Sequence, residues 1–200
     1  MRLIIATKNR NKLKEIKKIL KGLNIKILCL ADLKPDLKIK ESGKTFFENA
    51  LKKARCVSKM FNCDLIVGED SGIEVKYLKN KPGVFSRRYA GNIATDYENN
   101  IKLLKQLKNV PKDKRKARFR CVTVLVKKGE LIKTFEGKVE GYINNKLVGK
   151  KGFGYDSLFY LPSYKKTIAQ LSLAQKNKIS HRAKVFYKLK KFLANYIKNK

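Results

Sequence analysis

Apolar residues at the start of the chain follow two spacings, and each spacing predicts a different element. The run at residues 3–6 is short and uninterrupted, which is typical of a buried strand. Leu13, Ile16 and Ile19 then recur every three residues, which predicts one apolar face of a helix. A second strand is expected at residues 25–30. The N-terminal part of the chain is therefore predicted to alternate strands with helices.

The next predicted helix carries a capping signal at its start. Thr45 and Glu48 have the spacing of a capping box, and apolar residues then line one face for about four turns. The apolar run at residues 65–67 predicts a third buried strand. We expect this strand to end at Glu69 and Asp70, with the backbone turning away at Ser71-Gly72 before an alternating strand begins at Ile73.

The second half of the chain changes from helical spacing to alternation. Thr95 and Glu98 repeat the capping-box spacing and start a helix that is expected to end before Pro111. Apolar and polar positions then alternate over residues 117–142 around a turn at residues 128–129. This pattern predicts a long antiparallel hairpin.

The C-terminal part is predicted to end in a helix. Residues 152–161 combine glycine with aromatic residues and are expected to contain a loop and a strand. Ser172 and Gln175 give a third capping-box spacing, and a final amphipathic helix follows. Since no repeat or low-complexity linker interrupts this order, we predict a single α/β domain over residues 1–200.

Length and composition exclude several classes of protein. With 200 residues, 43% of them hydrophobic and 10% aromatic, the chain can bury a core, which disordered polybasic chains cannot do. It has no uncharged apolar run of about 18 residues, and its N-terminus turns polar too soon for a secretory signal. No CxxC pair is present, so we expect a cytoplasmic protein with reduced thiols at Cys29, Cys56, Cys63 and Cys121.

The charge balance first suggests a protein that binds nucleic acid. There are 49 Lys and Arg against 16 Asp and Glu, a formal net charge of +33, and such an excess attracts phosphate regardless of base sequence. A nucleic-acid-binding protein is therefore the main alternative from another functional class. However, the lysines are spread along almost the whole chain, without RNP-type aromatic strands, zinc-finger spacing or a detached basic arm. We interpret most of the excess as solvated surface.

The first segment with candidate chemistry is the loop that enters the first helix. A helix N-terminus offers unpaired backbone N–H groups and the positive end of the helix dipole. The loop adds hydroxyl, amide and cationic groups, and so forms a candidate triphosphate cradle from Thr7, Lys8, Asn9, Arg10, Asn11 and Lys12. An ordinary capped helix start is the alternative. The Ser42-Gly43-Lys44-Thr45 segment is not a Walker A loop, because Lys38 stands where that motif requires glycine.

The second segment places carboxylates at the expected end of a buried strand. Glu69 and Asp70 come soon after the apolar run, and Ser71-Gly72 would let the backbone turn away. Carboxylates suit a hard cation such as Mg²⁺, which completes its coordination with phosphate oxygens. Glu41 would add a further carboxylate. The alternative is a polar turn between two strands.

The third segment is aromatic and is followed later by cationic residues. Small residues beside aromatic rings make a slot for a planar base, and Lys, His and Arg can donate hydrogen bonds to carbonyl oxygens. The residues are Gly152, Phe153, Gly154, Tyr155 and Asp156, with Lys176, His181 and Arg182 further on. For His181, the only histidine, a structural role at a helix start is the alternative.

Together and in this order, these segments resemble the inosine triphosphate pyrophosphatase family, whose members remove deaminated purine nucleoside triphosphates. Each motif is weak alone, but their combination over residues 7–182 is highly specific. The motifs are Thr7-x-Asn9-x-x-Lys12, Glu41-Ser42-Gly43-x-Thr45-Phe46-x-Glu48-Asn49-Ala50, Glu69-Asp70-Ser71-Gly72, Pro82-Gly83-Val84-x-Ser86-x-Arg88, Gly152-Phe153-Gly154-Tyr155-Asp156 and Ile179-Ser180-His181-Arg182.

The resemblance implies a fold, a reaction and a cofactor. The implied fold is an elongated, two-lobed α/β architecture with a mixed central sheet and a substrate cleft between the lobes, assembled as a homodimer. The implied reaction is hydrolysis of ITP, dITP and XTP to the monophosphate and pyrophosphate with Mg²⁺. Small purine nucleotides are the implied partners, with no membrane and no specific nucleic acid.

The resemblance also implies a role for each matched residue. Thr7, Asn9 and Lys12 would hold the triphosphate. Glu41 and Asp70 would hold the metal with Glu69 nearby, and Asp70 would also be the general base. Further contacts to the substrate would come from Ser71, from Phe153 stacked on the purine, and from Gly154, Tyr155 and Asp156, while base recognition would come from Lys176, His181 and Arg182.

Two positions depart from the family pattern. Many members have a small residue where this chain has Lys8, and a second Asp where it has Glu69, so the pattern assigns metal binding more directly to Asp70 than to Glu69. A nearer alternative is a nucleotide pyrophosphatase of similar fold that acts on modified pyrimidines. The segment at residues 153–156 and the His181-Arg182 pair favour a purine instead.

Overall fold

The structure is a computed structural model that describes residues 2–61 and 64–198. Strands and helices alternate in its N-terminal part, as the sequence pattern predicts. These residues group into two compact units. Unit 1 takes the chain up to Asp70, Cys121–Gly137 and the segment from Arg182 onward, whereas unit 2 takes Ser71–Arg120 and Lys138–His181. Three long strands each contribute residues to both units.

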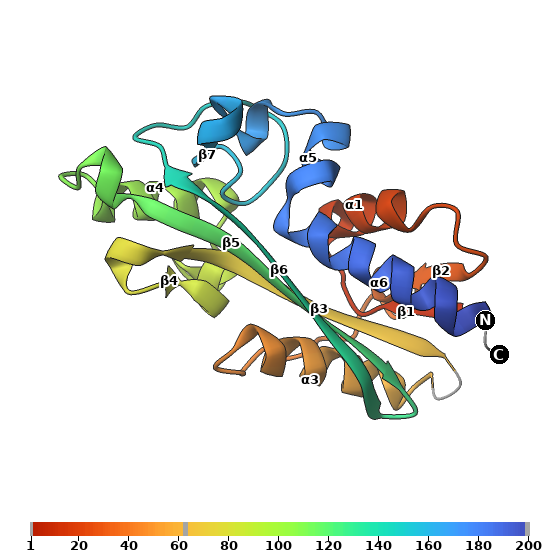
Figure 1. The fold of residues 1–200 in the computed structure, drawn as a ribbon. Helices are drawn as coiled ribbons and strands as arrows, with labels where there is room; N and C mark the ends of the chain where they lie inside the picture. The colour runs from red at the N-terminus through yellow and green to blue at the C-terminus, as the bar shows by residue number, and fades with distance from the viewer. Residues whose placement is uncertain (1, 62–63, 199–200) are drawn as a thin grey trace. The chain divides into compact units, whose positions relative to one another are not determined.

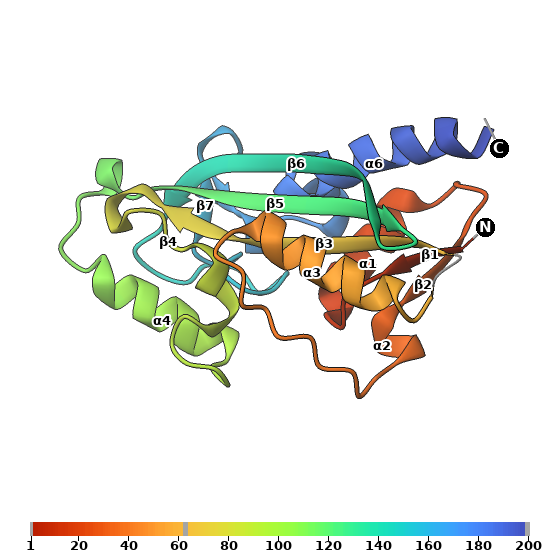
Figure 2. The same cartoon turned by 90° about the horizontal axis from the view of Figure 1, so that it is seen from below.

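Unit 1 is a sheet with helices on both faces (Figure 1, Figure 2). Its strands follow the order β2-β1-β3-β5-β6, and β1 runs parallel to both of its neighbours. The strands are β1 (Arg2–Ile5), β2 (Lys26–Cys29) and parts of β3 (Leu65–Val75), β5 (Lys116–Lys127) and β6 (Glu130–Ile143). The helices are α1 (Arg10–Leu20), α2 (Leu30–Leu33), α3 (Phe46–Ser58) and α6 (His181–Lys198).

The side chains of β3 alternate between the two faces of this sheet, as in any extended strand. Leu65 and Val67 pack with α1 and α6, whereas Ile66 packs with α3. The same alternation continues along the strand. It directs Glu69 toward α1 and α6, and Asp70 toward α3.

Gly68 brings β3 unusually close to α3. A Cβ atom at Gly68 would lie 2.0 Å from the carbonyl oxygen of Ala50, so no other residue fits without a backbone shift. This close approach sets the separation between α3 and the strand that carries Asp70.

The predicted turn at Ser71-Gly72 is wrong, because β3 continues without a break from Leu65 to Val75. Glycines and adjacent carboxylates are local turn signals. Here Gly68 serves the contact with α3, and cations from other elements satisfy the carboxylates. Glu69 and Asp70 therefore lie in the middle of a buried strand.

The helix starts confirm the predicted caps. The Thr45 hydroxyl accepts the Glu48 N–H at 3.1 Å, although the Glu48 carboxylate accepts the N–H of Lys44. The boxes that start at Thr95 and Ser172 are complete, with bonds in both directions.

Unit 2 combines the remaining parts of β3, β5 and β6 with short strands and two helices. The strands β4 (Lys81–Pro82), β7 (Phe159–Leu161) and β8 (Lys166–Thr167) pair antiparallel with β3, β6 and β7, respectively. The helices are α4 (Asp96–Gln106) and α5 (Leu173–Ile179). Leu103 of α4 packs into a core with Ile73, Phe119 and Phe159.

The structure also confirms the predicted hairpin. The predicted hairpin consists of β5 and β6, joined at Lys128 and Gly129 with φ angles of 51° and 81°. Cys29, Cys56 and Cys121 are thiols, and Cys63 lies outside the described residues. Within the described ranges, no helix has the length and apolar character needed to cross a membrane. The cleft between lobes stays a prediction.

We expect Gly68→Ala to lower the free energy of unfolding by about 1–3 kcal/mol, because the added methyl group overpacks the contact with Ala50 and forces the backbone to move. Urea unfolding followed by circular dichroism measures the change. An unchanged midpoint and slope would contradict the close approach described above.

Candidate active site

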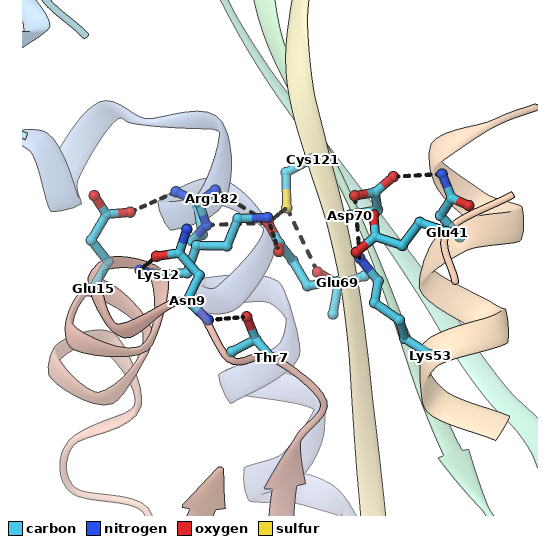
Figure 3. Close-up of polar contacts among 12 residues, drawn as sticks. Thr7, Asn9, Lys12, Glu15, Glu41, Lys53, Glu69, Asp70, Cys121 and Arg182 are labelled. Atoms are coloured by element: carbon cyan, nitrogen blue, oxygen red, sulfur yellow. Dashed lines mark hydrogen bonds and ion pairs between the residues drawn. The ribbon is translucent and has the colours of Figure 1, made fainter. Parts of the chain in front are cut away.

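Two neighbouring carboxylates of β3 point to opposite sides of the strand and contact different helices (Figure 3). Glu69 is 1% exposed and Asp70 is 6% exposed. Ionised groups at such depth need partners, because burial alone opposes their charge. Each carboxylate has cationic partners on its own side of the sheet.

Glu69 joins α1 and α6 through two cations. Its Oε2 accepts from the Lys12 ammonium at 2.7 Å, and its Oε1 accepts from Nε and Nη2 of Arg182, both at 3.2 Å. The Arg182 guanidinium also donates to Glu15 at 2.6 Å. This network stabilises the position of Lys12 relative to β3.

The charges of this network reinforce one another. Burial raises the pKa of Glu69, but the cations Lys12, Arg182 and Lys53 outweigh burial and hold that pKa well below its usual range. Burial lowers the pKa of Arg182, but Glu69 and Glu15 more than reverse this effect. Both partners therefore stay ionised at neutral pH.

Asp70 shares a single ammonium group with Glu41. The Lys53 Nζ lies 3.2 Å from Asp70 Oδ1 and 3.2 Å from Glu41 Oε1. Asn49 donates its Nδ2 to Asp70 Oδ2 at 3.1 Å. The Asn49 Oδ1 accepts the N–H of Gly43 at 2.8 Å, which fastens the segment near Glu41 to α3.

The environment of Asp70 favours proton uptake. Burial raises the pKa of Asp70, Lys53 and Lys12 lower it, and Glu41 and Glu69 raise it, so that the pKa lies above its usual value. A carboxylate with a raised pKa is a stronger base than an exposed aspartate. Burial lowers the pKa of Lys53, but Asp70 and Glu41 raise it overall, so Lys53 remains an ammonium.

The carboxylates of Glu41 and Asp70 fit a divalent cation. Their oxygens already converge on one positive charge, the ammonium of Lys53. Mg²⁺ prefers such hard oxygen ligands, and often takes only one or two carboxylates with water and phosphate oxygens. In the described part of the chain, no three His, Cys, Asp or Glu side chains are arranged to hold a metal. The pair would therefore need oxygens from substrate or water.

The candidate triphosphate loop caps α1 with its own side chains. The Thr7 Oγ1 accepts the N–H of Asn9 at 3.2 Å, and the Asn9 Oδ1 accepts the N–H of Lys12 at 3.0 Å. Both bonds use acceptor atoms, whereas phosphate requires donors. The Thr7 hydroxyl and the Asn9 amide can therefore donate to an anion beside Lys12.

The other residues of this loop lie elsewhere. Lys8 donates to the carbonyl oxygen of Pro35, and Arg10 pairs with Asp32 at 2.5 Å. Asn11 is exposed on α1. Of the predicted cradle, Lys12 joins the Glu69 network and Thr7 and Asn9 cap the start of α1, whereas Lys8 and Arg10 bond other parts of the chain.

In unit 2, Asp156 and Lys176 hold the aromatic segment. The Asp156 Oδ2 accepts the N–H of Phe153 at 2.9 Å and pairs with the Lys176 ammonium. That ammonium lies 4.6 Å from the centroid of the Phe153 ring, within cation–π range. A Cβ atom at Gly152 would lie 2.1 Å from Asp156 Oδ2, so glycine is required there.

The remaining predicted base-binding residues have different surroundings. His181 stacks on Phe119, with 4.8 Å between ring centroids. The Tyr155 hydroxyl donates to the carbonyl oxygen of Ser86 at 2.9 Å. Ser71 is half-buried at the start of the unit 2 segment. The guanidinium of Arg182 belongs to unit 1, where it bonds Glu15 and Glu69.

Sequence reasoning assigned no role to Asn49, Lys53 or Glu15, although Asn49 stands in one of the motifs. Asn49 and Lys53 are four positions apart on the buried face of α3, where their neighbours are apolar. Glu15 is the acidic residue on the buried face of α1. A polar residue on an otherwise apolar helix face was the available signal in each case.

Comparison with known proteins identifies the family to which the chain belongs. The sequence profile of the Ham1 family matches residues 3–192. A protein named dITP/XTP pyrophosphatase from Clostridium perfringens is 49% identical over 201 residues, which cover 98% of each chain. The structure of a HAM1 protein from Coxiella burnetii matches with a TM-score of 0.88 and 37% identity, covering 98% of this chain and 99% of that one. The Staphylococcus aureus Ham1 protein matches with a TM-score of 0.87 and 38% identity, covering 98% and 100%. These matches confirm the α/β fold with a mixed sheet.

We expect Glu69→Gln to lower the free energy of unfolding by about 3–5 kcal/mol, because it leaves the buried charge of Arg182 with one carboxylate fewer. Urea unfolding at pH 7 measures the change. Glu130→Gln, on an exposed carboxylate of β6, is the control and should change stability by less than about 0.5 kcal/mol.

The loss of stability in Glu69→Gln should also depend on pH. Folding lowers the pKa of Glu69, so its contribution is complete above the unfolded pKa and is lost as the pH falls through the folded pKa. The stability difference between wild type and Glu69→Gln should therefore shrink in acid. A difference that stays constant, or grows, on acidification would contradict the ionised network.

Proposed function

Because the chain belongs to the Ham1 family, we propose that it hydrolyses deaminated purine nucleoside triphosphates, such as dITP, ITP and XTP, to the monophosphate and pyrophosphate. Relatives that match nearly its full length bear the name dITP/XTP pyrophosphatase. The observation that carries the proposal is the convergence of Asp70 and Glu41 on the ammonium of Lys53. Residues 1–200 would act as a single pyrophosphatase domain.

In this proposal the phosphate groups are bound by donors of unit 1. These donors would be the Thr7 hydroxyl and the Asn9 amide, which cap α1, and the ammonium of Lys12 in its first turn, where the helix dipole also favours an anion. Glu69 orients Lys12 by pairing with it at 2.7 Å. Glu69 would therefore act by positioning Lys12.

Glu41 and Asp70 would hold the divalent cation, for which we propose Mg²⁺. When bound, the ion neutralises phosphate charge and lowers the pKa of water. The ammonium of Lys53 keeps the carboxylates of Glu41 and Asp70 together, since their mutual repulsion would otherwise separate them.

Asp70 is the proposed general base. Its raised pKa favours removal of a proton from the attacking water, and the bond from Asn49 fixes the orientation of the carboxylate. Attack at the α-phosphorus increases negative charge on the bridging and non-bridging oxygens. Lys12 can stabilise this charge more strongly in the transition state than in the ground state.

We propose that the purine stacks on Phe153 in unit 2, next to Gly154, Tyr155 and Asp156. Lys176 would donate to the 6-oxo group of hypoxanthine or xanthine, as its ammonium already lies at the Phe153 ring. A 6-amino group would leave such donors unpaired, at a cost of about 1–3 kcal/mol for each buried group. The contributions of Ser71, His181 and Arg182 to substrate binding stay predictions from the sequence.

The family resemblance also supports proposals about assembly and location. We propose a homodimer in the cytoplasm that acts on small nucleotides, with no membrane and no specific nucleic acid as partner. Most of the net charge of +33 would then be a property of the solvated surface.

We expect pyrophosphate release from ITP, dITP or XTP to exceed release from ATP and GTP by at least about tenfold, because each unpaired buried donor weakens the wrong complex by a kilocalorie or more. A coupled pyrophosphate assay across the five nucleotides measures this preference. Chelation of divalent ions with EDTA should abolish turnover, and added Mg²⁺ should restore it. Equal turnover of ITP and ATP would refute the proposed specificity.

We expect Asp70→Asn to lower kcat for ITP by about 10²–10⁴-fold, the usual contribution of a general base. Single-turnover assays measure the chemical step, and equilibrium binding of ITP should be retained within a few-fold. Asp113→Asn, on an exposed residue of unit 2, is the matched control and should keep full activity. A fully active Asp70→Asn protein would remove Asp70 from this role.

A further inference from the structure

Helix α4 bonds both backbone polar groups of Gly154, more than 50 residues away in the chain. The Asp96 Oδ2 accepts the Gly154 N–H at 2.7 Å, and the Asn100 Nδ2 donates to the Gly154 carbonyl oxygen at 2.8 Å. Gly154 has a φ angle of +62°, in the left-handed region that favours glycine. The side chains of α4 therefore bond both polar groups of this backbone position.

Neither side chain is needed to cap the helix from which it extends. Thr95 and Glu98 form a complete capping box at the start of α4. The carboxylate of Asp96, the next residue after the cap, reaches across to the loop instead. Asn100 is 3% exposed, and its Nδ2 also donates to the carbonyl oxygen of Asp96, which fixes the amide in its orientation.

Gly154 lies between the two aromatic residues of the loop. Phe153 precedes Gly154, and its N–H donates to Asp156 while Lys176 lies over its ring. Tyr155 follows Gly154, and its buried hydroxyl donates to the carbonyl oxygen of Ser86. The direction of the Phe153 ring therefore depends on bonds made by its neighbours in the loop, and the two bonds from α4 are the ones that fix the backbone of Gly154.

We propose that Asp96 and Asn100 are positioning residues for base selection: they fix the backbone at Gly154, and thereby the place of the Phe153 ring that receives the purine. The inference rests on the proposed function, because it takes Phe153 as the stacking residue. Stacking and donation to a 6-oxo group both depend on position within about an ångström, so a loosened loop should lose discrimination between bases. A substitution at Asp96 or Asn100 leaves the residues proposed to bind phosphate in unit 1 unaltered.

The test compares Asp96→Ala, which removes the acceptor, with Asp96→Asn, whose Oδ1 can still accept the Gly154 N–H. We expect Asp96→Ala to lower kcat/KM for ITP by about 10–100-fold with little change for ATP, because a charged hydrogen bond of this kind contributes that much. The ratio of ITP to ATP should fall by the same factor. Asp96→Asn should keep the ratio within about threefold, and Asp113→Ala is the matched control on an exposed aspartate.

A second measurement does not depend on turnover. With ¹⁵N-glycine labelling, the 12 glycines give a spectrum simple enough to assign the Gly154 amide by substitution. In Asp96→Ala this proton should move upfield and exchange faster with solvent, because its carboxylate acceptor is gone. An unmoved resonance would overturn the assigned contact whether or not the protein hydrolyses nucleotides.

The outcomes separate this inference from the proposed function. A wild-type protein without preference for ITP refutes the proposed function and with it the premise of base selection. If wild type prefers ITP but Asp96→Ala keeps the ITP to ATP ratio, the positioning role is overturned. An equal fall for both nucleotides also overturns it, because that pattern indicates a general structural defect.

Discussion

Strand β3 can carry two adjacent carboxylates through the interior because each meets a cation on its own side of the sheet. Lys12 and Arg182 neutralise Glu69 on one face, and Lys53 neutralises Asp70 on the other. Without these cations, burial of both charges would oppose folding by several kilocalories per mole each. The arrangement of α1, α3 and α6 around the strand is therefore tied to the same charges that the proposed chemistry uses.

The two faces support different tasks. The Glu69 face is a closed network in which the partners hold one another, so it is suited to placing Lys12 beside the α1 N-terminus. The Asp70 face is more open, since the side chain of Glu41 is 35% exposed, and a single lysine ammonium pairs with both of its carboxylates. A closed ionic network and a more open pair of carboxylates thus lie on opposite faces of one strand.

Local signals in the sequence were enough for α1, α3, α4 and the hairpin, but missed the short α2, the break between α5 and α6, and the continuity of β3. Capping boxes and the Lys128-Gly129 turn depend on residues a few positions apart, so the sequence determines them directly. In the sequence, Glu69 and Asp70 look like the polar end of a strand, because the cations that neutralise them are not nearby. Lys12 is 57 positions from Glu69, and Lys53 is 17 positions from Asp70. The motifs identified the carboxylates, but the division between faces, the shared Lys53 and the support from α4 depend on tertiary packing.

The alternation along β3 has a consequence for how this chain can change. Inserting or deleting one residue upstream within the strand would move Glu69 to the α3 side and Asp70 to the side of α1 and α6, without altering either residue. Each carboxylate would then face the wrong cations, and Gly68 would no longer oppose Ala50. The length of the strand segment before Gly68 is therefore constrained as strictly as the identity of the acids, and indels there should be rarer in evolution than substitutions of its apolar residues.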